Sequence, residues 1–345
     1  MTSREEIIKK IRDQLNDSAR PLFLFDDDPD GLAAFLLLYK MVRAGKGSAL
    51  KGSNLNEEYA EKVNEYSPDL VVILDKPIVE QDFFDKVKSK CIWIDHHELQ
   101  TPKGVTYFNP RKYDSEKNIP TSQLCYEITQ EDEWIAAVGI VADWCIPPQD
   151  IIKKTREKFG NVISEKIENA PDALYNSDIG KIARVFSFNL KGKAKDVYAS
   201  MKILSRIKSP QELLNEEHAQ AKLVMKQYKN HQKEYEKVLS QIEVNKEDSI
   251  LLFKYTDSSN SYTVDLSNEL LYRYPEKYII IARYHNNSYR CSLRSNKYPV
   301  EPILQDVLKT TGGTGGGHLH ACGAIIPEEQ FDNFVELIRD KTKAF

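Results

Sequence analysis

Residues 91–98 read Cys-Ile-Trp-Ile-Asp-His-His-Glu, an apolar run that ends in an acid and two adjacent histidines. Three other apolar runs also end on an acid: residues 22–25 precede Asp26, residues 71–74 precede Asp75, and residues 136–142 precede Asp143. Such runs are typical of buried strands or helices, and strands that are apolar throughout indicate a parallel sheet covered on both faces. We therefore expect buried elements that each deliver a carboxylate or an imidazole at the end.

Strand and helix patterns alternate through the first 150 residues. This alternation predicts a doubly wound α/β domain over residues 1–150. Ligands of such sheets bind beyond the carboxyl ends of the strands, where the acids and histidines fall. The elements expected here are an amphipathic helix at 3–18, strand 21–25, a buried helix from Gly31, strand 69–74, helix 80–89 and strand 91–94.

The remaining residues predict a helical connector over 151–248 and a smaller α/β domain over 249–345. Ser209 and Pro210 are a favourable helix start, and we expect one long helix over 210–243. That helix is interpreted as a connector between the domains, with a partner-binding coiled coil as the alternative. The second domain is expected to contain strands 250–255, 278–284 and 288–294, helices 264–274 and 300–309, and a helix from Glu328.

The overall composition limits the class of protein. The chain of 345 residues has 48 basic and 52 acidic side chains, which argues against a strongly basic coat for nucleic acid but leaves room for a local basic groove. Five scattered cysteines without a CxxC pair predict reduced thiols. With no signal-peptide pattern and no long apolar run, we expect a cytoplasmic protein and no membrane span.

The acids are spaced as metal ligands would be. In Asp26-x-Asp28-x-Asp30-Gly31, alternation places three carboxylates on one side of an extended loop. Acidic loops also occur at helix N-termini because the helix dipole favours them, so this motif alone leaves both interpretations open. Together with Asp75, Asp143 and the histidines it favours a metal site, and mixed Asp and His ligands suit a divalent ion that performs hydrolysis.

The two histidines are expected to have different roles. Neighbouring side chains of a strand face opposite ways, so only one of His96 and His97 should reach a given ion while the other faces substrate. Asp95 is placed to accept an imidazole N–H and to fix its tautomer.

The glycine run from Gly312 to Gly317, followed by His318, exposes backbone N–H groups that bind anions, phosphate above all. A flexible hinge or a tight turn is the alternative. The spacing matches neither a Walker A loop nor a dinucleotide-binding fingerprint. Arg294 ends a predicted strand and could supply a fork for phosphate, although an isolated arginine is more often a surface residue.

These motifs together resemble the DHH/DHHA1 phosphoesterase superfamily over nearly the whole chain. Asp26 to Gly31 matches the first family motif, Asp75 the single bridging acid, and Asp95-His96-His97 the triplet that names the family. The fourth motif matches Gly139 to Asp143. The Gly-Gly-Gly-His motif of the DHHA1 domain matches Gly315, Gly316, Gly317 and His318.

The resemblance implies a DHH domain over 1–150 and a DHHA1 domain over 249–345, facing each other across a cleft. It also implies two divalent ions, Mn²⁺ by preference and Mg²⁺ as an alternative. One ion would be held by Asp26, Asp28 and Asp75, and the other by Asp30, Asp75, His96 and Asp143. His97, assisted by Asp95, would act at the phosphate, and Arg294, Gly315, Gly316, Gly317 and His318 would bind substrate.

Within the superfamily the sequence is most similar to RecJ-like single-strand nucleases, including archaeal ones, which act on single-stranded DNA or RNA and serve in DNA repair. The branch of nanoRNases, pAp-phosphatases and cyclic-dinucleotide phosphodiesterases usually has a histidine at the position of Leu24. That branch, with short nucleotides as substrates, is the alternative, and polyphosphate hydrolysis is a further one. A non-enzymatic alternative is a replisome partner that binds GINS, as some archaeal relatives do.

Overall fold

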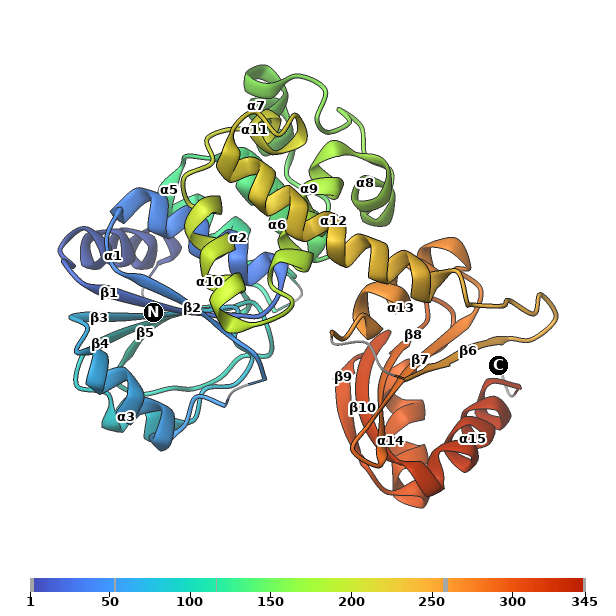
Figure 1. Ribbon diagram of the computed structural model, residues 1–345. Helices are drawn as coiled ribbons and strands as arrows, with labels where there is room; N and C mark the ends of the chain where they lie inside the picture. The colour runs from blue at the N-terminus through green and yellow to red at the C-terminus, as the bar shows by residue number, and fades with distance from the viewer. Residues whose placement is uncertain (1–2, 53, 116, 257–259, 344–345) are drawn as a thin grey trace. The chain divides into compact units, whose positions relative to one another are not determined.

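The computed structural model describes residues 3–52, 54–115, 117–256 and 260–343, and the chain forms two compact units, Met1–Lys229 and Asn230–Phe345 (Figure 1). Each unit is built around its own five-stranded sheet. None of the helices in these described ranges is both long and apolar enough to cross a membrane. The five cysteines are free thiols.

The sheet of the first unit is entirely parallel, with the strand order β2-β1-β3-β4-β5. Side chains on one face, such as Leu24 and Trp93, pack with α3 and α4, whereas Phe23 on the other face packs against Phe35 of α2, with ring centroids 5.6 Å apart. The predicted doubly wound α/β fold is therefore confirmed. The strands are β1 (Pro21–Asp26), β2 (Lys46–Leu50), β3 (Leu70–Leu74), β4 (Lys90–Ile94) and β5 (Val105–Phe108).

Helices cover both faces of this sheet and continue into an all-helical region. Apolar side chains line α6 on nearly every side, because it packs among α2, α5 and α9. The helices are α1 (Arg4–Asn16), α2 (Pro29–Val42), α3 (Glu57–Tyr66), α4 (Gln81–Lys86), the short 3-10 helix η1 (Pro110–Lys112), α5 (Thr121–Thr129), α6 (Glu133–Ala142), α7 (Gln149–Phe159), α8 (Ala170–Asn176), α9 (Asp178–Asn189), α10 (Ala194–Leu204) and α11 (Pro210–Leu214).

The predicted single helix over 210–243 is wrong, because α11 ends at Leu214 and a separate helix, α12 (Ala219–Leu239), follows. Glu216 between them has a φ of 51°, a left-handed conformation that a helix cannot contain. His218 then begins α12, since its Nδ1 accepts the backbone N–H of Ala221 at 3.1 Å. Helix-favouring composition on both sides concealed this break.

The second unit contains a mixed sheet with the strand order β6-β7-β8-β10-β9. Only β6 and β7 run parallel. The predicted glycine loop is wrong in one respect, because Thr314–His318 forms the edge strand β9, paired antiparallel with β10. The elements are β6 (Ile250–Tyr255), α13 (Thr263–Arg273), β7 (Tyr278–His285), β8 (Ser288–Arg294), α14 (Val300–Thr311), β9, β10 (Ala321–Pro327), the 3-10 helix η2 (Glu328–Gln330) and α15 (Phe331–Lys343).

Gly139 is expected to be essential for the packing of α6, whose C-cap is the predicted ligand Asp143. A Cβ at this position would lie 2.5 Å from Ser122 Oγ, 2.6 Å from Ser122 Cβ and 2.8 Å from Ala33 Cβ. Gly139→Ala should therefore lower the free energy of unfolding by about 1–3 kcal/mol, as overpacked cores do, in urea titrations followed by circular dichroism. Adding Ser122→Gly removes two of the three close atoms and should restore part of the loss. A Gly139→Ala protein as stable as the parent would contradict this packing.

Candidate metal centre and anion pocket

The first acidic motif is shaped by the junction of β1 and α2. Asp26 is the last residue of β1, and Asp28 is the N-cap of α2, its Oδ1 accepting the backbone N–H of Gly31 at 2.8 Å. A Cβ on Gly31 would lie 2.6 Å from the carbonyl oxygen of Asp26. Only glycine therefore lets the first turn of α2 lie this close to the end of β1.

Asp30 is buried and holds the start of another helix. Its Oδ2 accepts the backbone N–H of Thr121 at 2.7 Å, and its Oδ1 accepts that of Ser122 at 3.1 Å. These are the first two residues of α5, whose N-cap, Pro120, provides no side-chain acceptor. Asp30 thus supplies the negative charge that the N-terminus of a helix favours.

Asp75 follows β3 in a left-handed conformation, with a φ of 58°. Its backbone N–H donates to the carbonyl of Ile94 in the neighbouring strand at 3.0 Å, so the bend is held by the sheet. The buried carboxylate accepts the hydroxyl of Thr121 at 3.0 Å and lies 3.4 Å from Nε2 of His96. Asp75 therefore occupies the centre of the cluster.

His96 and His97 lie side by side, with ring centroids 4.4 Å apart. The expectation that they face opposite ways is therefore wrong. Strand β4 ends at Ile94, so the alternation of a strand no longer applies at these residues. Their contacts differ nonetheless, because Nδ1 of His96 is 2.9 Å from the side-chain oxygen of Asn118, whereas Nδ1 of His97 is 2.7 Å from Oδ1 of Asp95.

Asp95 is fully buried and is held from several directions. Its Oδ2 accepts the backbone N–H of His97 at 3.0 Å and the side-chain amide of Asn109 at 3.4 Å. The amide of Asn109 also donates to the backbone carbonyl of His97 at 3.1 Å. A carboxylate in this position makes Nδ1 of His97 the protonated nitrogen.

Asp143 completes the cluster from the end of α6, of which it is the C-cap. Its Oδ2 is buried, accepts no hydrogen bond from any residue that the structure describes, and lies 3.9 Å from Nδ1 of His96. A buried carboxylate oxygen without a donor is costly unless a cation binds there.

The electrostatics of the cluster show an excess of negative charge. Burial opposes ionisation of His96 and Asp75, but their mutual contact outweighs it, raising the pKa of His96 to about 11 and lowering the pKa of Asp75 to about 2. Burial, followed by the charge of Asp75, raises the pKa of Asp30 to about 8. Burial also raises the pKa of Asp143 to about 6. Added positive charge would stabilise such a group of carboxylates.

The donor set fits divalent cations. Carboxylate oxygens with one imidazole suit Mn²⁺ and also accommodate Mg²⁺. Asp75, His96 and His97 offer ligand atoms that lie within 4.8 Å of one another, and the unpaired oxygen of Asp143 adjoins them. The six residues predicted as metal ligands, Asp26, Asp28, Asp30, Asp75, His96 and Asp143, all lie at or beyond the ends of β1, β3, β4 and α6.

Lys76 belongs to the same cluster and was missed by the sequence reasoning. It follows Asp75 directly, is only 9% exposed, and its Nζ lies 2.8 Å from Oδ1 of Asp26. Its backbone carbonyl accepts the indole N–H of Trp93 at 3.0 Å, which fixes the segment. A lysine next to an acid at the end of a buried strand was the available signal. Thr121, Asn118 and Asn109 were also missed, because they lie between the motifs.

In the second unit, a pocket of about 350 Å³ contains most of the predicted substrate-binding residues. Arg294 is its best-anchored cation: Nε donates to Asn268 at 3.0 Å, and Nη1 donates to the carbonyls of Leu293 and Cys322 at 2.9 and 3.1 Å. Burial lowers the pKa of Arg294 to about 10. The lining is Ser261, Thr263, Val264, Arg290, Cys291, Ser292, Arg294, Gly316, Gly317, His318, Ala321, Cys322 and Gly323.

The charge of this pocket suits an anion. The three acceptors that anchor Arg294 are an amide oxygen and two backbone carbonyls, which carry no charge, so these contacts leave the positive charge of the guanidinium in place. Gly315 is not among the lining residues; its carbonyl instead accepts the side-chain amide of Gln305 at 3.2 Å. A partly desolvated guanidinium beside glycine backbone and an imidazole is a typical binding arrangement for phosphate.

Two family descriptions match the chain. The N-terminal domain of the DHH family matches residues 23–154, and the DHHA1 domain matches residues 251–344. Together they cover about two thirds of the sequence. No curated protein sequence matches the chain significantly.

Solved structures share this fold at low sequence identity. RecJ from Thermus thermophilus, in complex with Mn²⁺, has a TM-score of 0.70 and 14% identity over 100% of this chain, which spans 56% of that RecJ. The DHH domain of a member of a family of ribosomal proteins has a TM-score of 0.68 and 18% identity, over 98% of this chain and 90% of its own. The pGpG-specific phosphodiesterase PggH from Vibrio cholerae has a TM-score of 0.53 and 13% identity, over 94% of this chain and 99% of PggH.

At these identities the structures establish the fold alone. The two matched domains, in the same order as the sequence motifs, establish the family. The chain belongs to the DHH/DHHA1 phosphoesterase superfamily and has a RecJ-like fold.

Proposed function

We propose that this protein is a metal-dependent phosphodiesterase that hydrolyses nucleic acid, specifically a RecJ-like single-strand exonuclease. The observation that carries the proposal is the cluster at the ends of β1, β3, β4 and α6. There the acids gather around His96, and the positive charge present is too small to neutralise the carboxylates. Membership of the superfamily implies a hydrolase. Likeness to RecJ structures in complex with Mn²⁺ and with Mg²⁺ supports the choice of metal.

The acids divide into two ligand groups that share one member. Asp26, Asp28 and Asp75 would hold one ion, and Asp30, Asp75, His96 and Asp143 would hold the other, with Mn²⁺ preferred. When bound, such ions polarise a phosphoryl oxygen and make water a nucleophile at neutral pH. The residues of the chain fix the position of this chemistry, because Asp30 and Asp75 are themselves held by α5.

His97 is proposed to act on the substrate. Asp95 holds the proton on Nδ1 of His97 and orients the ring, and Nε2 is the nitrogen proposed to act at a phosphate oxygen or the leaving oxygen. Asn109 keeps Asp95 and the backbone of His97 in place. Asp95 is thus a positioning residue for His97.

The pocket of the second unit is proposed to bind a phosphate of the substrate. Arg294 and His318 would contact phosphate oxygens, with the backbone of Gly316 and Gly317 beside them. The division of the chain into a catalytic part over 1–150, a helical connector over 151–248 and a substrate-binding part over 249–345 is proposed on the same grounds.

The proposal is tested by hydrolysis assays with Mn²⁺ on end-labelled single-stranded DNA and RNA, alongside pAp and a cyclic dinucleotide. Stepwise shortening of a labelled strand is the expected result. Preference for pAp or the cyclic dinucleotide would overturn the exonuclease proposal in favour of a small-nucleotide enzyme, and no hydrolysis of any of these substrates would overturn both.

Arg294→Ala and His318→Ala are expected to raise KM for a single strand by about tenfold or more, since each removes a charge-assisted contact to phosphate. Metal content should stay at the parental value. Lys309→Ala is the matched control, because Lys309 is a well-exposed cation of the same unit outside the pocket. An unchanged KM in both pocket variants would exclude this pocket from substrate binding.

Lys76→Met is expected to strengthen Mn²⁺ binding by about tenfold. Lys76 neutralises Asp26, so a metal ion on that side competes with the ammonium group, and a hydrogen bond between charged groups contributes about 1.5–3 kcal/mol. Isothermal titration calorimetry of the metal-free protein measures the change. Lys86→Met is the control, since Lys86 pairs with Glu57 at the surface. Weaker Mn²⁺ binding would mean that Lys76 instead holds Asp26 ready for the metal.

A further inference from the structure

A row of cationic side chains lies in the first unit, next to the acidic cluster. Strand β2 forms the edge of the parallel sheet, and its last residue, Leu50, pairs with Asp26. Lys51 comes next, so it lies at the carboxyl ends of the strands, where the predicted metal ligands also lie. The Nζ of Lys51 donates to the backbone carbonyl of Gly192 at 3.3 Å, which brings the loop before α10 to this position.

The loop before α10 is strongly basic. Lys191, Lys193 and Lys195 occur within five residues, and Lys193 and Lys195 are exposed. The Nζ of Lys191 lies over the ring of Phe188, 5.8 Å from its centroid. Because Lys51 contacts Gly192 within this loop, the basic loop lies beside the end of β2.

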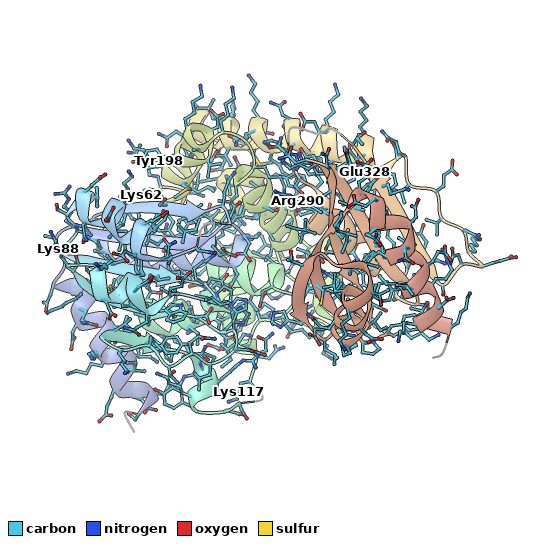
Figure 2. The ribbon with its side chains drawn as sticks, turned by 90° about the horizontal axis from the view of Figure 1, so that it is seen from below. Lys62, Lys88, Lys117, Tyr198, Arg290 and Glu328 are labelled. Atoms are coloured by element: carbon cyan, nitrogen blue, oxygen red, sulfur yellow. The ribbon has the colours of Figure 1, made fainter. Side chains whose placement is uncertain are left out.

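The same row continues along β2 to an exposed aromatic ring. Lys46, at the other end of β2, lies over Tyr198 of α10 at 6.0 Å and over Tyr66 at 5.6 Å. Arg20 also lies over the ring of Tyr66, at 4.5 Å. Tyr198 is 47% exposed, and Figure 2 shows it at the surface of the first unit. Contacts at both ends thus place α10 alongside β2.

Two acids of these segments, Asp69 and Asp196, lie near backbone N–H groups. Asp69 accepts the backbone N–H groups of Ala19 and Arg20, at 2.7 Å and about 3 Å. Asp196 lies in the first turn of α10, where the helix dipole stabilises an acid. The positive charge of the exposed Lys193 and Lys195 therefore faces solvent, where an external anion can reach it.

We propose that this basic strip, consisting of Lys46, Lys51, Lys191, Lys193, Lys195 and Tyr198, binds the part of a single-stranded nucleic acid that lies beyond the cleaved phosphate. The inference rests on the proposed function and extends it to a polymeric substrate. Lysines contact successive phosphates, and an exposed aromatic ring stacks on an unpaired base. The five residues of β2 extend over roughly 13–17 Å at about 3.3 Å each, which a mononucleotide cannot span.

The strip is tested with the variant Lys51→Gln/Lys193→Gln/Lys195→Gln and, separately, with Tyr198→Ala. Binding of a fluorescently labelled single strand is followed by anisotropy at several salt concentrations without added metal, so that the result does not depend on hydrolysis. The matched control is Lys9→Gln/Lys10→Gln/Lys153→Gln, which removes three exposed lysines of the same unit. Circular dichroism verifies that each variant is folded.

The triple strip variant is expected to bind the strand at least tenfold more weakly. A plot of the logarithm of its binding constant against the logarithm of salt concentration should also be less steep, by about 0.7 for each phosphate that the protein no longer neutralises. Tyr198→Ala should weaken binding with little change in salt dependence, because stacking releases few counterions. Equal affinities in the strip and control variants would overturn the proposal. So would a parent protein that binds duplex DNA as tightly as it binds the single strand.

In hydrolysis assays, KM of the triple strip variant for a long strand should rise more than its KM for a dinucleotide. A parent that binds the strand through the strip but hydrolyses neither substrate would refute the proposed function and leave the strip intact.

Discussion

A protein carrying Asp75→Asn is expected to lose phosphodiester hydrolysis by about 10²–10³-fold, the range found when an enzyme loses one central electrostatic contact. It should also bind less metal. Asp75 lies against His96 and Thr121 in the middle of the cluster and is assigned to both ion sites. Elemental analysis of the protein after dialysis against Mn²⁺ measures the number of bound ions, which should fall from two.

Asparagine is the informative substitution at this position. Asp75 has a φ of 58°, and asparagine accepts that conformation more readily than most residues, so the fold should be kept. Asp75→Ala adds backbone strain of about 1 kcal/mol and would confuse the result. Asp150→Asn, an exposed acid paired loosely with Lys154, is the control. Two ions at full occupancy in Asp75→Asn would exclude the bridging role.

The two adjacent histidines are expected to respond differently to substitution. His96→Ala should lose metal, because Nε2 of His96 lies against Asp75. His97→Ala should retain both ions and lose about 10²–10⁴-fold in rate, the contribution typical of a general acid or base. Metal content and single-turnover hydrolysis, measured on the same preparations, separate the two effects.

Because the rings are 4.4 Å apart, proximity alone does not distinguish these roles. The distinguishing contacts are those to Asn118 and to Asp95. Asp95→Asn provides a further comparison, since it should reduce the rate as His97→Ala does while metal content stays unchanged. Metal loss in His97→Ala, with full metal in His96→Ala, would reverse the assignment.

The sequence predicted the parts of the fold whose signals are strong. The largely apolar strands β1, β3 and β4 were recognised because both faces of the sheet are covered, and each one either ends on an acid or is followed directly by one. Strand β2 was missed, since Lys46–Leu50 reads Lys-Gly-Ser-Ala-Leu and lies at an edge where burial is partial. For the same reason the basic strip beside β2 could not be inferred from the sequence.

Other differences arise from conformations that composition does not encode. The break between α11 and α12 depends on the left-handed Glu216, a residue type that otherwise favours helix. The glycines of β9 form a strand because β10 supplies the pairing, which overrides their poor strand propensity. Lys76 was not assigned to the site because its partner, Asp26, lies 50 residues away in the chain.

The caps formed by Asp28 and Asp30 affect how related chains should be interpreted. Asp28 begins α2 and Asp30 begins α5, so selection for folding alone would keep both acids in a descendant that had lost its chemistry. Asp143 does not cap the start of a helix, and its Oδ2 accepts no hydrogen bond from the described residues. Asp95 and His97 pair with each other and do not start a helix either. An inactive relative would therefore be identified by changes at Asp143 or His97, whereas an intact pair at Asp28 and Asp30 would reveal only a preserved architecture.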